Sequence, residues 1–149
     1  MLERVKTQAR EQIIEQLTAA LQPHQEILEA YLFGSLARGD AQPHSDVDVA
    51  VYVTDAALVE PGFGFAARLG ADLQQALART DVDIVLLNRA TPLLYHRVLR
   101  DGVRLLSREL SATTRREGQA LSRYCDDLPR LRLLEEAHKA RINAGDFGR

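Results

Sequence analysis

The sequence GSLARGDAQPHSDVDV occupies residues 34–49 and connects two segments that have the pattern of β-strands. The segment before it, residues 27–33 (ILEAYLF), is a short apolar run of the length expected for a buried strand. The second segment, residues 46–53 (DVDVAVYV), begins within this stretch. Its residues alternate between two faces, with valines on one face and Asp46 and Asp48 on the other. About a dozen residues without a long helical pattern separate the strands, which argues against a regular doubly wound fold.

This connection contains residue types suited to a phosphate and a divalent cation. Gly34 and Ser35 follow the first strand, and a short helix beginning at Ser35 would direct backbone N–H groups and the serine hydroxyl toward the strand end. Asp46 and Asp48 share a strand face with a rise of about 7 Å between them, so both carboxylates can reach one cation. The alternatives are a simple turn and a solvent-exposed strand face.

A third carboxylate lies in the next strand pattern, residues 82–87 (VDIVLL). Asp83 is flanked there by apolar residues, and an unpaired buried carboxylate costs several kcal/mol, so this position predicts a cation or strong donors nearby. The alternative is an edge strand whose aspartate faces water. Asp81 precedes the apolar run and is the weaker candidate.

The remaining patterns predict helices around a small sheet. They are an amphipathic helix over 2–21, a loop over 55–64, a helix over 65–79, a helix from Thr91–Pro92 to Gly102, a short edge strand over 103–106, and two helices between 109 and 142 separated near Pro129. We therefore expect an α+β fold, with a small mixed β-sheet flanked by helices and further helices at the C-terminus.

Composition excludes several classes of protein. The 149 residues suit one compact domain, and the net charge of −2 argues against a uniformly basic nucleic-acid binder. The charges are unevenly distributed, with 6 basic and 13 acidic side chains in residues 1–88 and 13 basic and 8 acidic in residues 89–149. A single cysteine, Cys125, forms no internal disulfide, and no apolar run approaches the length of a membrane span or signal segment. We therefore expect a cytoplasmic protein.

The arginines of the second half have two interpretations, as a solvated helical face or as a binding patch for an acidic partner or a nucleotide phosphate. They are Arg97, Arg100, Arg104, Arg108, Arg115, Arg116 and Arg123. The solvated face is the commoner arrangement for such a series.

The acids and the Gly-Ser pair together resemble a known signature. Gly34-Ser35, ten further residues and then Asp46-Val47-Asp48, with Asp83 later, resemble the DNA polymerase beta-like nucleotidyltransferase superfamily. More narrowly, GSLARGDAQPHSDVDVAV resembles the minimal nucleotidyltransferases (MNT), the antitoxin partners of HEPN-domain toxins. The resemblance extends to VDIVLLNRATPLLYHRVLRDGVRLL and RYCDD. It implies a nucleotidyltransferase domain over residues 1–108 and a C-terminal helical extension of the same domain over 109–149.

This resemblance implies transfer of AMP from ATP to a tyrosine hydroxyl of a cognate HEPN-family RNase toxin, with Mg²⁺ or Mn²⁺ as cofactor. It implies that Asp46, Asp48 and Asp83 are catalytic and hold the metal, and that Asp83 also assists deprotonation of the acceptor hydroxyl. The nucleotide-binding residues that it implies are Gly34, Ser35, Arg38 and Asp40. We expect a hetero-oligomer with the toxin, without direct contact to nucleic acid or membrane.

Two other functions stay open at the level of sequence. The chain could neutralise a toxin by complex formation without catalysis, although a pure binder has no physical need for three clustered acids. It could also modify a small molecule or an RNA end, although the short chain after the third strand leaves little room for a separate substrate domain.

Overall fold

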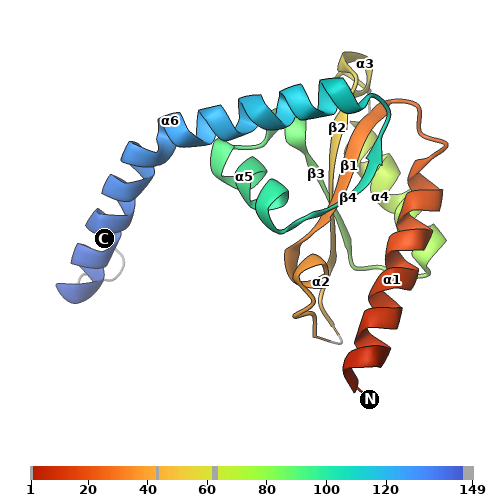
Figure 1. The fold of residues 1–149 in the computed structure, drawn as a ribbon, viewed down its shortest axis with the longest axis horizontal. Coiled ribbons are helices and arrows are strands. Elements are labelled where there is room, and N and C mark those ends of the chain that lie inside the picture. The colour runs from red at the N-terminus through yellow and green to blue at the C-terminus, as the bar shows by residue number, and fades with distance from the viewer. Residues whose placement is uncertain (1, 43, 62–63, 146–149) are drawn as a thin grey trace.

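The computed structural model describes residues 2–42, 44–61 and 64–145, which form one sheet with helices on both faces (Figure 1). In chain order the elements are α1 (Leu2–Leu21), β1 (Ile27–Phe33), α2 (Gly34–Arg38), β2 (Val47–Val53), α3 (Asp55–Leu58), α4 (Gly64–Leu77), β3 (Val82–Leu86), the 3₁₀ turn η1 (Leu87–Arg89), α5 (Pro92–Asp101), β4 (Val103–Ser107) and α6 (Leu110–Asn143). No described helix combines the length and the apolar character needed to cross a membrane.

The four strands form one mixed sheet in the order β3-β2-β1-β4. Strand β1 runs antiparallel to both β2 and β4, whereas β2 and β3 run parallel. The predicted α+β fold with a small mixed sheet is therefore confirmed. Because β2 is central and β3 lies beside it, the two strands that carry the candidate acids are direct neighbours.

One face of the sheet packs against α1 and α4 (Figure 1). All four valines of β2 belong to this apolar core, as the alternation predicts, together with leucines from both helices. The fully buried members include Val47, Val49, Val51, Leu17, Leu21, Leu69 and Leu73. Burial of side chains of this size contributes roughly 1.5–3 kcal/mol each, so this layer holds β2 firmly in place.

The opposite face packs against α5 and the first part of α6, and it contains a buried polar cluster. Glu29 of β1 is completely buried and accepts a hydrogen bond of 3.0 Å from the Tyr95 hydroxyl. Its other oxygen lies 3.4 Å from Nε of Arg116 on α6, without a hydrogen bond between them. The Arg116 guanidinium also lies 4.7 Å from the centre of the Tyr52 ring. These contacts link α6 to the sheet by charge as well as by apolar packing.

The helix α6 differs from the sequence prediction, because residues 110–143 form one helix that contains Pro129. A proline within a helix removes one backbone hydrogen bond and disturbs the preceding turn, which bends the helix without necessarily ending it. Figure 1 shows α6 changing direction along its length and extending away from the sheet. The predicted break near Pro129 is therefore wrong.

A second difference concerns residues 55–64, which the sequence predicts as a loop. The first part forms the short helix α3 (Asp55–Leu58), and Gly64 already belongs to α4. Residues 62 and 63 lie outside the described part of the chain. The buried side chain of Ala57 gives α3 a contact with the core, and tertiary contact of this kind is not visible in local sequence.

The arginine series of the second half does not form one free surface. Arg100 binds the neighbouring Asp101, Arg104 binds Glu117, Arg116 faces Glu29, and Arg108 donates to the carbonyl oxygens of Gln22, His24 and Ile27. Four of the seven arginines therefore have partners within the chain, so the series is not one set of unpaired cations.

Candidate functional site

The site is built around a close approach between Gly34 and Asp48. Gly34 begins α2 with a φ of +76°, in the left-handed region that favours glycine. A Cβ atom at this position would overlap Oδ2 of Asp48. Residue 34 must therefore be glycine both for its backbone conformation and for the space that the Asp48 carboxylate occupies.

Three carboxylates gather at this end of the sheet. Asp48 of β2 lies directly opposite Asp83 of β3 in the parallel register, and Asp46 immediately precedes β2. Burial raises the pKa of Asp48, and the negative charges of Asp83 and Asp46 raise it further, while Arg38 acts in the opposite direction. The structure thus brings together the three acids that the sequence singles out, at distances where their charges repel.

The donor set suits a divalent cation that arrives with a nucleotide. Within residues 2–42, 44–61 and 64–145, no three acidic, histidine or cysteine side chains are arranged to hold a metal ion on their own. Mg²⁺ is usually bound by one or two carboxylates together with substrate phosphates and water, and it rarely uses a cage made only of protein groups. Carboxylates that repel one another, next to the place where Gly34 passes close to Asp48, fit a site of this shared kind.

Asp83 is exposed, contrary to the prediction that it is a buried charge in need of a partner. Strand β3 forms an edge of the described sheet, so one side of it faces solvent and the alternative of a water-facing aspartate is correct. Asp81 is already engaged, because it accepts two hydrogen bonds from Arg79, and hydrogen bonding from Arg79 is the main reason that its pKa is lowered. Its interpretation as the weaker candidate therefore agrees with its contacts.

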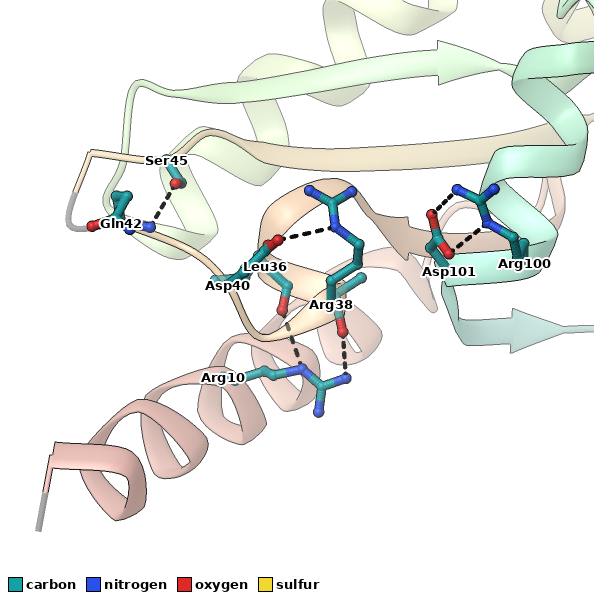
Figure 2. A network of polar contacts seen from close by, with 9 residues as sticks. Arg10, Leu36, Arg38, Asp40, Gln42, Ser45, Arg100 and Asp101 are labelled. Carbon is teal, nitrogen blue, oxygen red and sulfur yellow. Dashed lines mark hydrogen bonds and ion pairs between the residues drawn. The ribbon is translucent and has the colours of Figure 1, made fainter.

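Arg38 and Asp40 lie where α2 ends. Nε of Arg38 is 3.2 Å from a carboxylate oxygen of Asp40, and Gly39 between them adopts a φ of +82°. Figure 2 shows the Arg38 guanidinium between Asp40 and the Asp101 side chain of α5. The charge of Arg38 opposes the raised pKa of Asp48, and it adds to the lowered pKa of Asp101, which is due mainly to the hydrogen bond from Arg100. This arginine therefore supplies positive potential beside the acids.

Two further arginines contact this connection, and local sequence does not single out either of them. Arg10 of α1 donates to carbonyl oxygens of α2, and Arg79 donates to the carbonyl oxygen of Ser45. Both contacts join residues more than 25 positions apart, so no local pattern marks them. Ser35, which the sequence does single out, accepts the backbone N–H of Asp40 at 3.1 Å through its own carbonyl oxygen.

The family model described as polymerase beta, nucleotidyltransferase matches residues 15–110, which contain the Gly-Ser pair and all three acids. The chain belongs to this nucleotidyltransferase family. No protein with a curated description matches it.

Several solved structures similar to this nucleotidyltransferase are toxin–antitoxin complexes. A chain of a toxin–antitoxin with AMP-PNP is 24% identical, with 84% of this chain and 98% of that chain covered and a TM-score of 0.68. A chain of a mutant toxin–antitoxin MntA–HpeT is 25% identical, with coverages of 83% and 96% and a TM-score of 0.66.

A third similar structure is a complex of a tri-AMPylated Shewanella oneidensis HEPN toxin with an MNT antitoxin. The compared chain is 21% identical, with 87% of this chain and 98% of that chain covered and a TM-score of 0.65. At such identities the likeness establishes that the nucleotidyltransferase shares their fold, which agrees with the resemblance stated from its sequence.

Proposed function

We propose that this nucleotidyltransferase is an MNT antitoxin that transfers AMP from ATP to a tyrosine hydroxyl of a partner HEPN-family RNase toxin. One observation carries the proposal. Asp48 lies between Gly34 at the start of α2 and Asp83 on β3, so the Gly-Ser pair and the cluster of carboxylates are next to each other. The similar structures with AMP-PNP and with a tri-AMPylated HEPN toxin support the same nucleotide and the same class of partner.

The proposed reaction needs no covalent enzyme intermediate. The tyrosine oxygen forms a bond to the α-phosphorus of ATP while the bond from that phosphorus to the leaving oxygen breaks, and pyrophosphate departs. The hydroxyl proton passes to Asp83. Because Asp83 is exposed on its edge strand, it can return this proton to water after each transfer.

The other proposed roles follow from position and charge. Gly34 and Ser35 hold the triphosphate at the start of α2, where the glycine lets the backbone pass close to the Asp48 carboxylate. Arg38 binds a phosphate oxygen, which suits a half-exposed guanidinium whose charge already reaches Asp48. Asp40 orients Arg38 through their ion pair.

Asp46, Asp48 and Asp83 would hold Mg²⁺ or Mn²⁺ together with phosphate oxygens of the nucleotide in this proposal. The cation would neutralise the negative charge that develops on the phosphates and orient them for displacement. The raised pKa of Asp48 supports this role, since nearby positive charge would relieve the repulsion among the three carboxylates.

The test combines the purified chain, ATP, Mg²⁺ and a HEPN-family toxin as the proposed partner. We expect the intact mass of that protein to increase by one or more AMP units and its RNase activity to fall. Asp46→Ala and Asp48→Ala should abolish both effects, whereas Asp126→Asn, an exposed change on α6, should behave like the wild type.

Two results would contradict the catalytic proposal. The absence of any mass increase with each of the four ribonucleoside triphosphates would exclude AMP transfer to this toxin. If the double variant Asp46→Ala/Asp48→Ala still suppressed toxin activity fully, neutralisation by complex formation would be the correct function.

A further inference from the structure

The candidate site lies on the connection between β1 and β2, residues 34–46. Arg10 of α1 contacts the first part of this connection. The side chain of Arg10 extends from α1, donating from Nε to the carbonyl oxygen of Leu36 at 3.1 Å and from Nη2 to that of Ala37 at 2.8 Å (Figure 2). The last carbonyl groups of a helix lack partners within the helix. Arg10 therefore satisfies the end of α2, the helix that begins with Gly34 and Ser35.

The same connection is held near its last part by Arg79. Its Nη2 donates to the carbonyl oxygen of Ser45 at 2.9 Å, and its guanidinium binds the Asp81 carboxylate at the same time. Ser45 immediately precedes Asp46, and the charge of Asp46 contributes to the raised pKa of Arg79, after the larger effect of the Asp81 hydrogen bond. Arg79 thus fixes the backbone next to the first candidate metal ligand.

The backbone around Arg79 is itself arranged for this contact. Ala78 adopts a φ of +51°, which is uncommon for a residue with a side chain and costs roughly 1 kcal/mol or more. This conformation turns the chain out of α4 and is followed directly by Arg79. The carbonyl oxygen of Asp81, two residues later, accepts the backbone N–H of Val47 at 2.8 Å, so the segment 79–81 contacts the start of β2 twice.

Apolar packing alone does not hold the middle of the connection. Residues of α1, α2 and the following loop line a cavity of about 530 Å³, and Arg10 and Arg79 both belong to its wall. Gly39, Ala41 and Gln42 border this cavity. Residue 43 lies outside the described part of the chain. The hydrogen bonds of the two arginines join the two parts of the connection to α1 and to the segment directly after α4 beside this cavity.

We propose that Arg10 and Arg79 are positioning residues that clamp the catalytic connection at two points, Arg10 holding the Gly34–Ser35 end through α2 and Arg79 holding the Asp46 end through Ser45. This inference rests on the proposed nucleotidyl transfer and deepens it. Neither arginine is assigned contact with substrate. Each acts through the backbone that carries the groups facing the nucleotide.

The two contacts predict different kinetic effects. Loss of Arg10 loosens the segment that holds the triphosphate, so the KM for ATP should rise about tenfold in Arg10→Ala, with a smaller change in kcat. Loss of Arg79 loosens the segment that carries Asp46, so Arg79→Ala should require a higher Mg²⁺ concentration for half-maximal rate, by about tenfold. Arg10→Lys retains the charge but lacks the fork of donors that reaches both carbonyl groups, and should recover part of the loss.

Backbone hydrogen exchange provides a readout that does not depend on activity. The amide of Asp40 donates to Ser35 within the part held by Arg10, and the amides of Ser45 and Val47 donate within the part held by Arg79. We expect Arg10→Ala to accelerate exchange mainly at Asp40, and Arg79→Ala to accelerate it mainly at Ser45 and Val47, by about tenfold in each case. Amides in the middle of β1 should be unchanged in both variants.

Two arginines outside the connection provide matched controls. Arg4→Ala removes an exposed arginine from the same helix as Arg10. Arg68→Ala removes an arginine of α4 that binds Glu60 and Glu26. Both variants should retain the wild-type KM, Mg²⁺ dependence and exchange rates.

The outcomes separate this inference from the proposed function. If the wild type transfers no AMP, the proposed function fails, and the exchange rates still decide whether the arginines clamp the connection. If the wild type transfers AMP, and Arg10→Ala and Arg79→Ala match Arg4→Ala and Arg68→Ala in exchange rates, KM and Mg²⁺ dependence, the clamp is overturned. Where Arg10→Ala or Arg79→Ala fails to fold, Arg10→Lys and Arg79→Lys are compared in its place, and wild-type exchange in them at Asp40, Ser45 and Val47 together with wild-type kinetics would likewise overturn it.

Discussion

At the scale of single residues, the site depends on a glycine whose missing side chain leaves room for a carboxylate. Gly34 lies so close to Asp48 that any Cβ atom would overlap the carboxylate oxygen. The same carboxylate is repelled by Asp83 and Asp46. Such an arrangement lowers the stability of the isolated chain, and groups that shift one another's pKa in this way are characteristic of functional sites.

Asp48→Asn should stabilise the isolated chain at neutral pH, by about 0.5–1 kcal/mol, the scale of a partly exposed charge interaction. The folded state raises the pKa of Asp48, so its ionised form is disfavoured relative to the unfolded chain. This unfavourable contribution is present above the folded-state pKa and disappears as the pH falls below the unfolded-state value. Urea unfolding should therefore give a higher free energy of unfolding for Asp48→Asn than for the wild type at neutral pH, and equal values in acid.

With Mg²⁺ and AMP-PNP present, the wild type should become more stable to urea than Asp48→Asn, because the wild type gains binding energy that Asp48→Asn lacks. Asp126→Asn serves as the control and should follow the wild type under both conditions. Equal stabilisation of Asp48→Asn and the wild type by the nucleotide and metal would show that Asp48 takes no part in binding them.

A second prediction at this scale concerns the buried Glu29 and its ion pair with Arg116. Removal of one partner of a buried ion pair leaves an uncompensated charge, so Arg116→Met should lower the free energy of unfolding by about 3 kcal/mol. The double variant Glu29→Gln/Arg116→Met should recover most of this loss, since the amide oxygen of glutamine still accepts the Tyr95 hydroxyl. Urea unfolding at pH 7 measures the free energy of unfolding of each variant. If the loss in the double variant equalled the sum of the losses in the two single variants, the pairing would be contradicted.

At the scale of elements, α5 shows how far local sequence determines structure. Thr91 accepts the backbone N–H of Leu94 through its side chain, Pro92 occupies the first turn, and the helix ends before Gly102, as the sequence predicts. A Cβ atom at Gly102 would overlap the carbonyl oxygen of Val98. Each of these signals acts over a few residues, and no distant contact is needed to recognise it.

The N-terminal cap of α5 can be tested against a threonine in the same position of another helix. Thr91→Ala should cost about 1 kcal/mol, which corresponds to a fall in Tm of about 2–4 °C for a domain of this size. Thr54 precedes α3 in the same way, but its side chain makes no capping hydrogen bond. Thr54→Ala should therefore change Tm less, and an equal fall in the two variants would exclude capping as the cause.

At the scale of the whole molecule, α6 consists of a part that belongs to the sheet and a part that extends beyond it (Figure 1). The buried residues of α6 are Thr113 and Ala120, both in its first half. Between residues 130 and 145, all of them described, every side chain except Leu131 is exposed. The distal part of α6 therefore contributes little to the core.

Removal of residues 130–149 should change Tm by less than about 2 °C, since it exposes almost no buried surface. Removal of residues 110–149 should unfold the chain, because it also uncovers Glu29 and Tyr95 on the second face of the sheet. Differential scanning calorimetry of the two truncated chains makes the comparison. A large loss of stability in the shorter truncation would show that the distal part packs against the domain in solution.

Local sequence determined those features of this protein that depend on near neighbours. The valine alternation of β2, the strand over 27–33, the start and end of α5 and the Gly-Ser-to-acid spacing are all readable because backbone preferences and side-chain periodicity act within a few residues.

The tertiary structure decided which of these segments meet. It placed β3 at an edge beside β2, which sets Asp83 opposite Asp48 and leaves it exposed, and it brought Arg10 and Arg79 onto the connection between β1 and β2. It also carried α6 through Pro129. These outcomes depend on the burial of surfaces and the pairing of strands far apart in the chain, for which a local pattern contains no signal.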